Sequence, residues 1–336
     1  MNILFTSSGR RGYLLRFFKE ALNGKGLVHA ANSIAINTAF LEADRTVVTP
    51  LIHDKNYIGF LLDYCDRFAI KVIIPLFDMD LPVLAANIEL FQDKGITLVA
   101  SSTDVAKVCN DKWETYTFLS RNGFHTPMTY LSLNSAVNAI SEGELSFPVM
   151  VKPRWGMASI GIYVAEDMNE LNVLHTKTRR DIERSYLRYE SAGSEDSDVI
   201  TQEILLGQEY GLDVINDLNG SYITTFAKKK IAMRAGETDA AITIKDAMLS
   251  DLGKTLSGFL GHKANLDVDV IVSGKKPYIL EMNARFGGGY PFSHLAGADL
   301  PKAILSWIKG KPADPSCFTL SEGVITMKAI EPRLHQ

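Results

Sequence analysis

The first hundred residues alternate short apolar runs with segments of helical periodicity. Apolar runs of strand length occupy residues 2–6, 27–31, 71–76 and 97–100. Apolar side chains recur three and four positions apart, as on one face of a helix, over residues 12–22, 57–68 and 81–91. Strands that alternate with helices in this way form parallel sheets. The order therefore predicts an α/β domain up to about residue 105, with helices on both faces of its sheet.

The rest of the chain has a different order, with more strands than helices. Helical patterns cover residues 111–121, 168–189, 245–259 and 301–307. Strand patterns cover residues 148–152, 161–164, 199–203, 210–216, 221–230, 266–273 and 277–282. Gly274 and Lys275 separate the last two strands and predict a hairpin. A chain of 336 residues exceeds the usual single domain, so we expect an α/β unit followed by a mixed α+β unit.

Composition narrows the class of protein. The net charge is −4, and no long run of Lys or Arg is present, which argues against a nucleic-acid partner. No apolar run is long enough to cross a bilayer, so no membrane partner is expected. The cysteines at 65, 109 and 317 lie far apart and predict neither a disulfide framework nor a zinc site. A reducing, cytoplasmic location fits this pattern best.

The most informative segment is residues 278–285, which reads "YILEMNAR". Side chains alternate between the two faces of a strand, so Glu281, Asn283 and Arg285 are expected to point the same way. Carboxylate and amide oxygens are ligands that Mg²⁺ prefers, and an arginine can bind a phosphate oxygen. An antiparallel return of the preceding strand would bring Asp267 or Asp269 beside Glu281 as a third ligand. The alternative is a solvated strand face on which the acid and the arginine pair.

A second segment, residues 147–153, reads "FPVMVKP" and places Lys152 at the end of a buried strand. A buried ammonium is costly unless an anion pairs with it. The loop at 154–161 follows and is rich in small residues, among them Ser159 and Gly161. This combination suits a triphosphate. The alternative is an ordinary hairpin whose lysine extends its ammonium to solvent.

A third segment, residues 201–209, reads "TQEILLGQE" and is an apolar strand that ends in a turn. A nucleotide hinge needs an acceptor for the base, a backbone amide and an acceptor for the ribose. Glu203, Leu206 and Glu209 have the types and spacing to supply them. Ordinary acids of an edge strand would produce the same pattern.

Taken together and in this order, "VMVKP", "QEILLGQEY" and "EMNAR" resemble the ATP-grasp superfamily. The resemblance is to one synthetase unit of the carbamoyl-phosphate synthetase large subunit and to smaller carboxylate–amine ligases of that branch. It covers nearly the whole chain, and its specific part runs from residue 110 to residue 291. A full carbamoyl-phosphate synthetase has two such units, and this sequence contains one.

The resemblance implies roles for individual residues. It places the phosphate-side lysines at Lys112 and Lys152, the adenine acceptor at Glu203, the adenine-contacting main chain at Leu205 and Leu206, and the ribose acceptor at Glu209. It places the metal ligands at Asp269, Glu281 and Asn283, and the phosphate arginine at Arg285. The choice of Asp269 over Asp267 depends on the register of the hairpin.

The resemblance also implies an architecture and a chemistry. It predicts an α/β domain over 1–108, an ATP-grasp domain over 109–310 with a lid at about 115–203, and a tail over 311–336. A mobile connector is expected at 191–198, and the tail is expected to pack back as a strand near 324–329. A carboxylate would attack the γ-phosphate of ATP with Mg²⁺ or Mn²⁺ present, and an amine would then displace phosphate from the acyl phosphate. Phosphorylation of bicarbonate and a non-catalytic ATP-binding module are the alternatives.

The acceptor substrate is expected beyond the carboxyl ends of the parallel strands, where ligands of open α/β sheets bind. Arg10 and Asp78 follow strands of that sheet, and Arg234 and Glu237 lie where the resemblance places acceptor contacts. Such a mixture suits a zwitterion such as an amino acid, and Arg234 joins Lys152 and Arg285 as a candidate catalytic residue. Residues 234–239 do not match a carbamate-binding pattern, however. Alternatively, Arg10 and its neighbour only cap the sheet edge. The sequence also leaves room for a homodimer.

Overall fold

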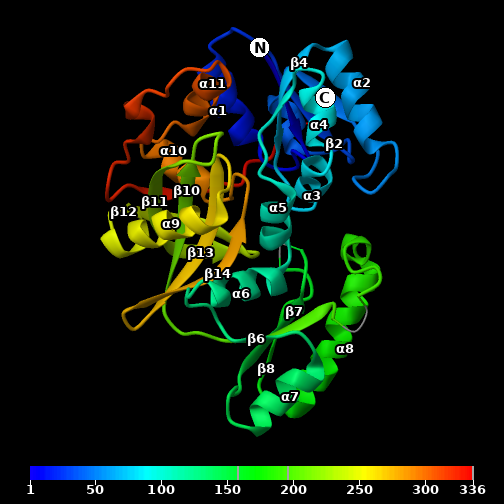
Figure 1. Cartoon of the computed structure of the whole chain (residues 1–336), viewed down its shortest axis with the longest axis vertical. Helices are drawn as coiled ribbons and strands as arrows, with labels where there is room; N and C mark the ends of the chain where they lie inside the picture. Colours follow the sequence, from blue (N-terminus) through cyan, green and yellow to red (C-terminus); the bar gives the residue numbers. More distant parts are fainter. Residues whose placement is uncertain (157–158, 195–196, 335–336) are drawn as a thin grey trace.

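The computed structural model describes residues 1–156, 159–194 and 197–334. Within them, the strands form three sheets that build three units, stacked along the long axis of the molecule (Figure 1). We refer to them as the N-terminal, central and small units. The mixed α/β and α+β class predicted from the sequence is confirmed. The undescribed pairs fall in the loop predicted at 154–161, the connector at 191–198 and the end of the tail.

The N-terminal unit is a five-stranded parallel sheet in the order β3-β2-β1-β4-β5. Its strands are β1 (Asn2–Thr6), β2 (Val28–Asn32), β3 (Arg45–Val48), β4 (Ile70–Pro75) and β5 (Thr97–Leu98). Its helices are α1 (Gly12–Leu22), η1 (Thr38–Glu42), α2 (Tyr57–Arg67), α3 (Asp80–Ala85) and α4 (Ile88–Gln92). Ile3 and Phe5 pack with α1 on one face, and Leu4 packs with α2 on the other. Both faces are therefore covered, as the parallel-sheet prediction requires.

The central unit is a six-stranded sheet in the order β14-β13-β10-β11-β12-β15. Its strands are β10 (Gln208–Asn216), β11 (Tyr222–Arg234), β12 (Glu237–Ile244), β13 (Asn265–Ser273), β14 (Lys276–Asn283) and β15 (Ile325–Met327). Its helices are α5 (Thr103–Asn110), α6 (Lys112–Arg121), α9 (Ala247–Leu260), α10 (Tyr290–Leu295), α11 (Leu300–Ile308) and η3 (Pro315–Phe318). Leu212, Leu256 and Met282 belong to the apolar core under this sheet. The other face is left for the functional site.

The small unit is a four-stranded sheet in the order β6-β9-β7-β8, with its helices on one side (Figure 1). It comprises β6 (Thr129–Tyr130), α7 (Leu133–Ser141), β7 (Val149–Pro153), β8 (Tyr163–Ala165), α8 (Met168–Arg184), η2 (Tyr186–Tyr189) and β9 (Val199–Glu203). Val149, Val151 and Leu171 lie in a core of its own. Separate cores mean that the small unit and the central sheet are packed bodies joined by short connections.

Contacts between aromatic rings join the far end of the small unit to the N-terminal unit. The imidazole of His53 stacks on the ring of Tyr189 with 4.8 Å between centroids. Phe77 meets Tyr186 edge to face at 5.8 Å. The Asn110 amide also donates to the Glu190 carboxylate over 3.1 Å. The small unit is thus held at its tip as well as at its base.

Some predicted helices have different boundaries. The segment 81–91 is divided into α3 and α4, because the backbone leaves helical geometry at Asn87. The segment 168–189 is helical only to Arg184, since Ser185 is extended and accepts a hydrogen bond that begins η2. The helix predicted from residue 111 begins at Lys112, and the Asp111 side chain caps it by accepting from the amides of Trp113 and Glu114.

The sequence patterns missed β12, because they assigned no strand between residues 230 and 266. Residues 235 and 236 form a two-residue turn with positive φ angles at Ala235 and Gly236, and β11 and β12 pair on either side of it. The tail returns as predicted: β15 pairs with β12, and Arg333 reaches Glu42 of the N-terminal unit at 3.4 Å. In the described part of the chain, no helix has both the length and the apolar character needed to cross a membrane.

Two glycines of α9 have opposite surroundings, and this contrast gives a stability prediction. A Cβ atom on Gly253 would lie 2.3 Å from the Thr225 hydroxyl of β11, whereas one on Gly258 would meet nothing within 4 Å. We expect Gly253→Ala to destabilise the protein by about 1–3 kcal/mol through overpacking. Gly258→Ala should stabilise it by about 0.5–1 kcal/mol, because alanine favours helix. Urea unfolding of both variants measures this difference, and equal effects at the two positions would contradict it.

Candidate active site

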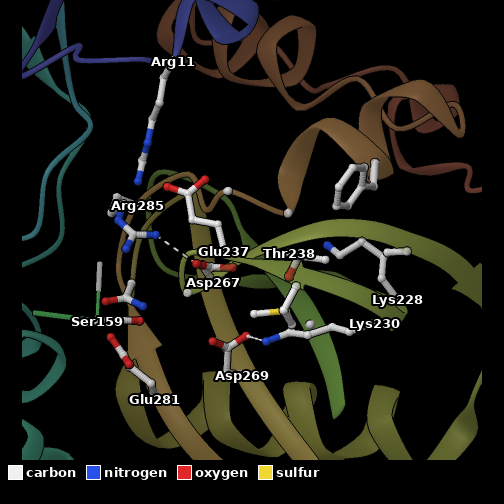
Figure 2. Close-up of a pocket in the computed structure, with 18 of the residues that line it drawn as sticks. Arg11, Ser159, Lys228, Lys230, Glu237, Thr238, Asp267, Asp269, Glu281 and Arg285 are labelled. Atoms are coloured by element: carbon white, nitrogen blue, oxygen red, sulfur yellow. Dashed lines mark hydrogen bonds and ion pairs between the residues drawn. The ribbon is translucent and has the colours of Figure 1, made fainter. Parts of the chain in front are cut away.

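A cavity lies on the open face of the central sheet, where the N-terminal unit, the small unit and the β11–β12 hairpin meet (Figure 2). Charged side chains from four parts of the chain enter it. Those that line it are Arg11, Lys112, Lys228, Lys230, Glu237, Asp267, Asp269, Glu281 and Arg285. Glycines 156, 211, 236, 288 and 289, with Ser159, Thr238, Asn283 and Phe292, complete most of the lining. The sequence-predicted residues among these are thus brought together from positions up to 173 residues apart in the chain.

The hairpin of β13 and β14 sets the oxygen ligands in register. Asp269 pairs with Glu281, and Asp267 pairs with Asn283. Glu281, Asn283 and Asp269 therefore line one wall of the cavity, and the set of two carboxylates and one amide suits Mg²⁺. Within the described ranges, no three His, Cys, Asp or Glu side chains gather as a metal cluster, and the side-chain amide of Asn283 adds an oxygen atom to the two carboxylates of this wall.

The carboxyl of Asp269 has a raised pKa that reflects its burial and the other charges of this wall. Burial, together with the neighbouring Asp267 and Glu281 carboxylates, raises the pKa of its carboxyl to about 6, although Lys230 at 2.8 Å acts in the opposite direction. Negative charges that raise one another's pKa are stabilised by an added cation. The residues present therefore fit a divalent metal.

Arg285 lies outside the strand on which alternation placed it. β14 ends at Asn283, and the guanidinium of Arg285 pairs with Asp78 of the N-terminal unit at 2.8 Å and with Asp267 at 2.9 Å. These two carboxylates raise the pKa of Arg285, although its burial acts in the opposite direction. Asp78 is thus engaged by Arg285, and it does not line the cavity as an acceptor residue.

Lys152 is buried and does not itself line the cavity, and its ammonium donates to the Gln202 side-chain oxygen over 2.7 Å. Burial, together with the nearby Lys112 ammonium, lowers the pKa of Lys152 to about 8. Lys112 itself lines the cavity and donates to the Gly156 carbonyl over 2.6 Å. Among the described residues, neither ammonium forms an ion pair across the cavity, although the Glu281 carboxylate acts on Lys152 from a distance. Two neighbouring ammonium groups of this kind would stabilise phosphate oxygens.

The residues predicted for the hinge lie outside the cavity lining, on the connection from β9 to β10. The Glu203 carboxylate accepts from the Met128 amide over 3.1 Å, and Glu209 accepts from Lys230 over 3.4 Å. The Leu206 side chain is 84% exposed, and Leu205 is half-buried. Gly161 packs against Pro153 behind the loop, whereas Ser159 lines the cavity.

The predicted acceptor residues are not all brought together. Glu237 lines the cavity. Arg10 is exposed and its guanidinium lies 3.9 Å from the Glu237 carboxylate. Arg234 pairs with Asp239 on the outer side of the hairpin and does not line the cavity. Arg11 enters the cavity instead and donates to the Phe286 carbonyl over 2.5 Å.

Two cationic residues, Lys228 and Lys230, were absent from the sequence prediction. Both are buried, whereas Lys229 between them is exposed. Lys228 is paired with Asp213 and donates to the Ser293 hydroxyl over 3.0 Å. The alternation of side chains along this strand could have revealed them. Residues 228 and 230 are two positions apart and must therefore lie on the same face of the strand.

Sequence comparison places this cavity in a known family. A model of the N-terminal domain of PylC-like proteins matches residues 3–99, and a model of the ATP-grasp domain matches residues 109–289, more than half of the chain. The chain belongs to the ATP-grasp family. The ATP-grasp match covers every residue that lines the cavity except Arg11 and Phe292.

Relatives of the ATP-grasp chain include the arginine-specific large chain of carbamoyl phosphate synthase from Geobacillus stearothermophilus. The two are 20% identical over 290 residues, which are 83% of this chain and 26% of the relative. The chain therefore spans about a quarter of that relative's length.

Solved structures share the ATP-grasp fold over most of the chain. The L-amino acid ligase from Bacillus licheniformis has a TM-score of 0.70 and 19% identity, covering 90% of this chain and 74% of the other. Biotin carboxylase from Campylobacter jejuni has a TM-score of 0.75 and 15% identity, covering 96% and 74%. At these identities the likeness demonstrates a common fold.

The low pKa of Lys152 gives a prediction on proton uptake. At pH 8 about half of the Lys152 side chains are neutral in the folded protein, and a bound phosphate favours the ammonium form. Binding of Mg-ADP at pH 8 should therefore take up a proton, and its affinity should fall as the pH rises above 8. Calorimetric titrations in buffers of different ionisation enthalpy measure the uptake.

Two variants test the assignment of this proton to Lys152. Lys152→Met should abolish the proton uptake on Mg-ADP binding, and Lys71→Met, at an exposed position of β4, should retain it. Uptake that persists in Lys152→Met would assign the proton to another group.

Proposed function

We propose that this chain is an ATP- and Mg²⁺-dependent ligase that activates a carboxylate as an acyl phosphate and joins it to an amine, with release of ADP and phosphate. The observation that supports this most is the composition of one cavity. It has an oxygen-rich wall of Asp269, Glu281 and Asn283, and it also holds the cations Lys112, Lys230 and Arg285. Oxygen ligands beside several cations suit a metal-bound triphosphate.

The chain's residues would divide the work in the following way. Asp269, Glu281 and Asn283 would hold Mg²⁺, or Mn²⁺, which has similar ligand preferences. The metal would supply positive charge to the phosphates. Lys112, Lys152 and Arg285 would bind phosphate oxygens and stabilise the negative charge of the transferring group, since phosphoryl transfer depends on positioning and electrostatics. Arg234, a candidate catalytic residue from the sequence, pairs with Asp239 and does not line the cavity.

The adenosine would lie along the connection between β9 and β10, with Glu203 accepting from the adenine amino group, the main chain of Leu205 and Leu206 at the base, and Glu209 on the ribose. The small unit, within a lid of about 115–203, would cover the phosphates with the loop that carries Ser159 and Gly161. A covered site would exclude water from the acyl phosphate. The N-terminal domain over 1–108 would supply Arg11 for the acceptor end, and Glu237 would face it.

The two steps balance without an enzyme nucleophile. A substrate carboxylate oxygen attacks the γ-phosphorus, and the bond to the oxygen of ADP breaks. The amine nitrogen then attacks the acyl carbon, phosphate leaves, and the nitrogen loses a proton. Phosphorylation of bicarbonate is the second candidate, which the likeness to a carbamoyl phosphate synthase chain favours.

A screen of ADP release tests the proposal. The protein with Mg-ATP should release ADP only when an organic acid and an amine are both present. ADP release with bicarbonate and ammonia alone would favour the second candidate. ATP binding without turnover for any pair would reduce the chain to an ATP-binding module.

The metal wall has its own variant. Glu281→Ala should lower ADP release at least a thousandfold while leaving the unfolding midpoint unchanged, because it removes a metal ligand rather than a core contact. Glu89→Gln, at an exposed position of α4, is the matched carboxylate control and should retain full activity. Near-normal turnover in a folded Glu281→Ala protein would sink the assignment.

The hinge predicts a difference between nucleotides. Glu203→Ala should weaken ATP binding by about 1.5–3 kcal/mol, the value of a hydrogen bond to a charged group, and should weaken GTP binding less. Glu209→Ala should weaken both nucleotides equally, because they share the ribose. Competition binding measures the four constants. An equal loss for ATP and GTP in Glu203→Ala would make this residue purely structural.

A further inference from the structure

The C-terminal strand brings one more charged side chain to the acceptor end of the cavity. β15 pairs with β12, and the amide of Lys328, directly after β15, donates to the Asp239 carbonyl over 2.8 Å. The Lys328 ammonium then donates to the Oε2 atom of Glu237, at the start of β12, over 3.1 Å. This contact joins residues 91 positions apart in the chain.

The ion pair of Lys328 and Glu237 lies over a glycine that leaves room for it. A Cβ atom on Gly288 would stand 3.3 Å from the Lys328 ammonium and 3.7 Å from the Glu237 carboxylate. The ammonium also lies 5.9 Å from the ring centroid of Phe292. Gly288, Phe292 and Glu237 all line the cavity. Glu237 thus belongs to the cavity wall, and Lys328 holds it from the cavity's edge, where the Lys328 side chain is 23% exposed.

Glu237 has one oxygen in use and one to spare. Oε2 accepts from Lys328, whereas Oε1 has only the exposed Arg10 at 3.9 Å, among the residues that the structure describes. Lys328 is the main cause that lowers the pKa of Glu237, with Arg10 and Arg11 adding to it against the effect of burial. The carboxylate is thus held ionised and directed by Lys328, with a free acceptor atom.

The charges around Glu237 indicate which substrate group it faces. Of the other carboxylates that line the cavity, Asp267 pairs with Arg285 and Asp269 pairs with Lys230, while Glu281 belongs to the proposed metal site. Figure 2 shows the guanidinium of Arg11 beside the Glu237 carboxylate, where it contributes to the low pKa of Glu237, and Arg285 lines the same cavity. A plain carboxylate substrate would be attracted by the arginines and repelled by Glu237. A molecule that also carries an ammonium group one or two bonds away would be attracted by all three.

We propose that Glu237 is the receptor for the ammonium group of an α-amino acid whose carboxylate is bound by Arg11 and Arg285, and that Lys328 is a positioning residue that holds Glu237 for this purpose. The inference rests on the proposed function, in which ATP phosphorylates that carboxylate. It makes the C-terminal strand a part of the substrate site.

The test measures binding, so that it does not depend on turnover. The protein saturated with Mg-ADP is titrated calorimetrically with each of the twenty L-amino acids. The one that binds most tightly is then compared with the same molecule lacking its amino group. Wild-type protein should prefer the amino acid by roughly tenfold or more, because a hydrogen bond between charged groups is lost in the analogue.

Four variants separate positioning from structure. Glu237→Gln should remove the preference, and Lys328→Met should reduce it at least fivefold. Lys328→Arg should retain it, since a guanidinium can also donate to Oε2. Lys302→Met is the matched control, because Lys302 on α11 pairs with Asp314 at 3.5 Å and should leave the preference unchanged. Affinity for Mg-ADP should be the same in all four.

Three results would overturn the inference: no L-amino acid binds, the analogue without the amino group binds as tightly, or Lys328→Met keeps the full preference. If Lys328→Met lowers the unfolding midpoint and leaves the preference for the amino acid unchanged, Lys328 only stabilises the packing of the C-terminal tail. Binding of an amino acid without any ADP release would keep the inference and contradict the proposed function. If the protein binds no amino acid but releases ADP with acids that lack an amino group, the proposed function stands and the inference is contradicted.

Discussion

The guanidinium of Arg285 is the buried charge around which the N-terminal and central units meet. It is 4% exposed, and two carboxylates from different units share it. A buried guanidinium is costly unless its donors are paired, so its position specifies how the loop after β4 docks on the end of β14. Arg11, which enters the cavity from the N-terminal unit, lies close enough that Arg285 lowers its pKa. The acceptor end of the cavity therefore depends on this docking.

Those parts of the site that lie on regular strands could be predicted from the sequence. A strand has a period of two, and a short hairpin aligns its partners, so local pattern alone puts Glu281 and Asn283 on one face and either Asp267 or Asp269 opposite Glu281. The core of the N-terminal unit follows for the same reason. The open choice between Asp267 and Asp269 needed the register, which places Asp269 opposite Glu281 and gives Asp267 to Arg285.

The remaining parts depend on contacts between distant segments. Arg10 and Arg11 are equivalent in the sequence, and only the docking of α1 against the central unit directs Arg11 inward. Arg234 and Glu237 flank one turn, yet they pair with different partners, since the hairpin places Arg234 beside Asp239 and Glu237 beside the tail. A lysine 91 positions away has no local pattern that could connect it to Glu237. Charges that pair between distant segments leave no periodic pattern in the sequence from which the pairing could be predicted.

The aromatic contacts at the tip of the small unit affect how it can move. Opening the small unit at the cavity separates His53 from Tyr189 and Phe77 from Tyr186, and ring pairs of this kind contribute about 0.5–1.5 kcal/mol each beyond the area they bury. Phe77 precedes Asp78, which holds Arg285. In the proposed function the small unit covers the nucleotide, so separating these rings would add a cost to its opening that is independent of any contact with the nucleotide itself.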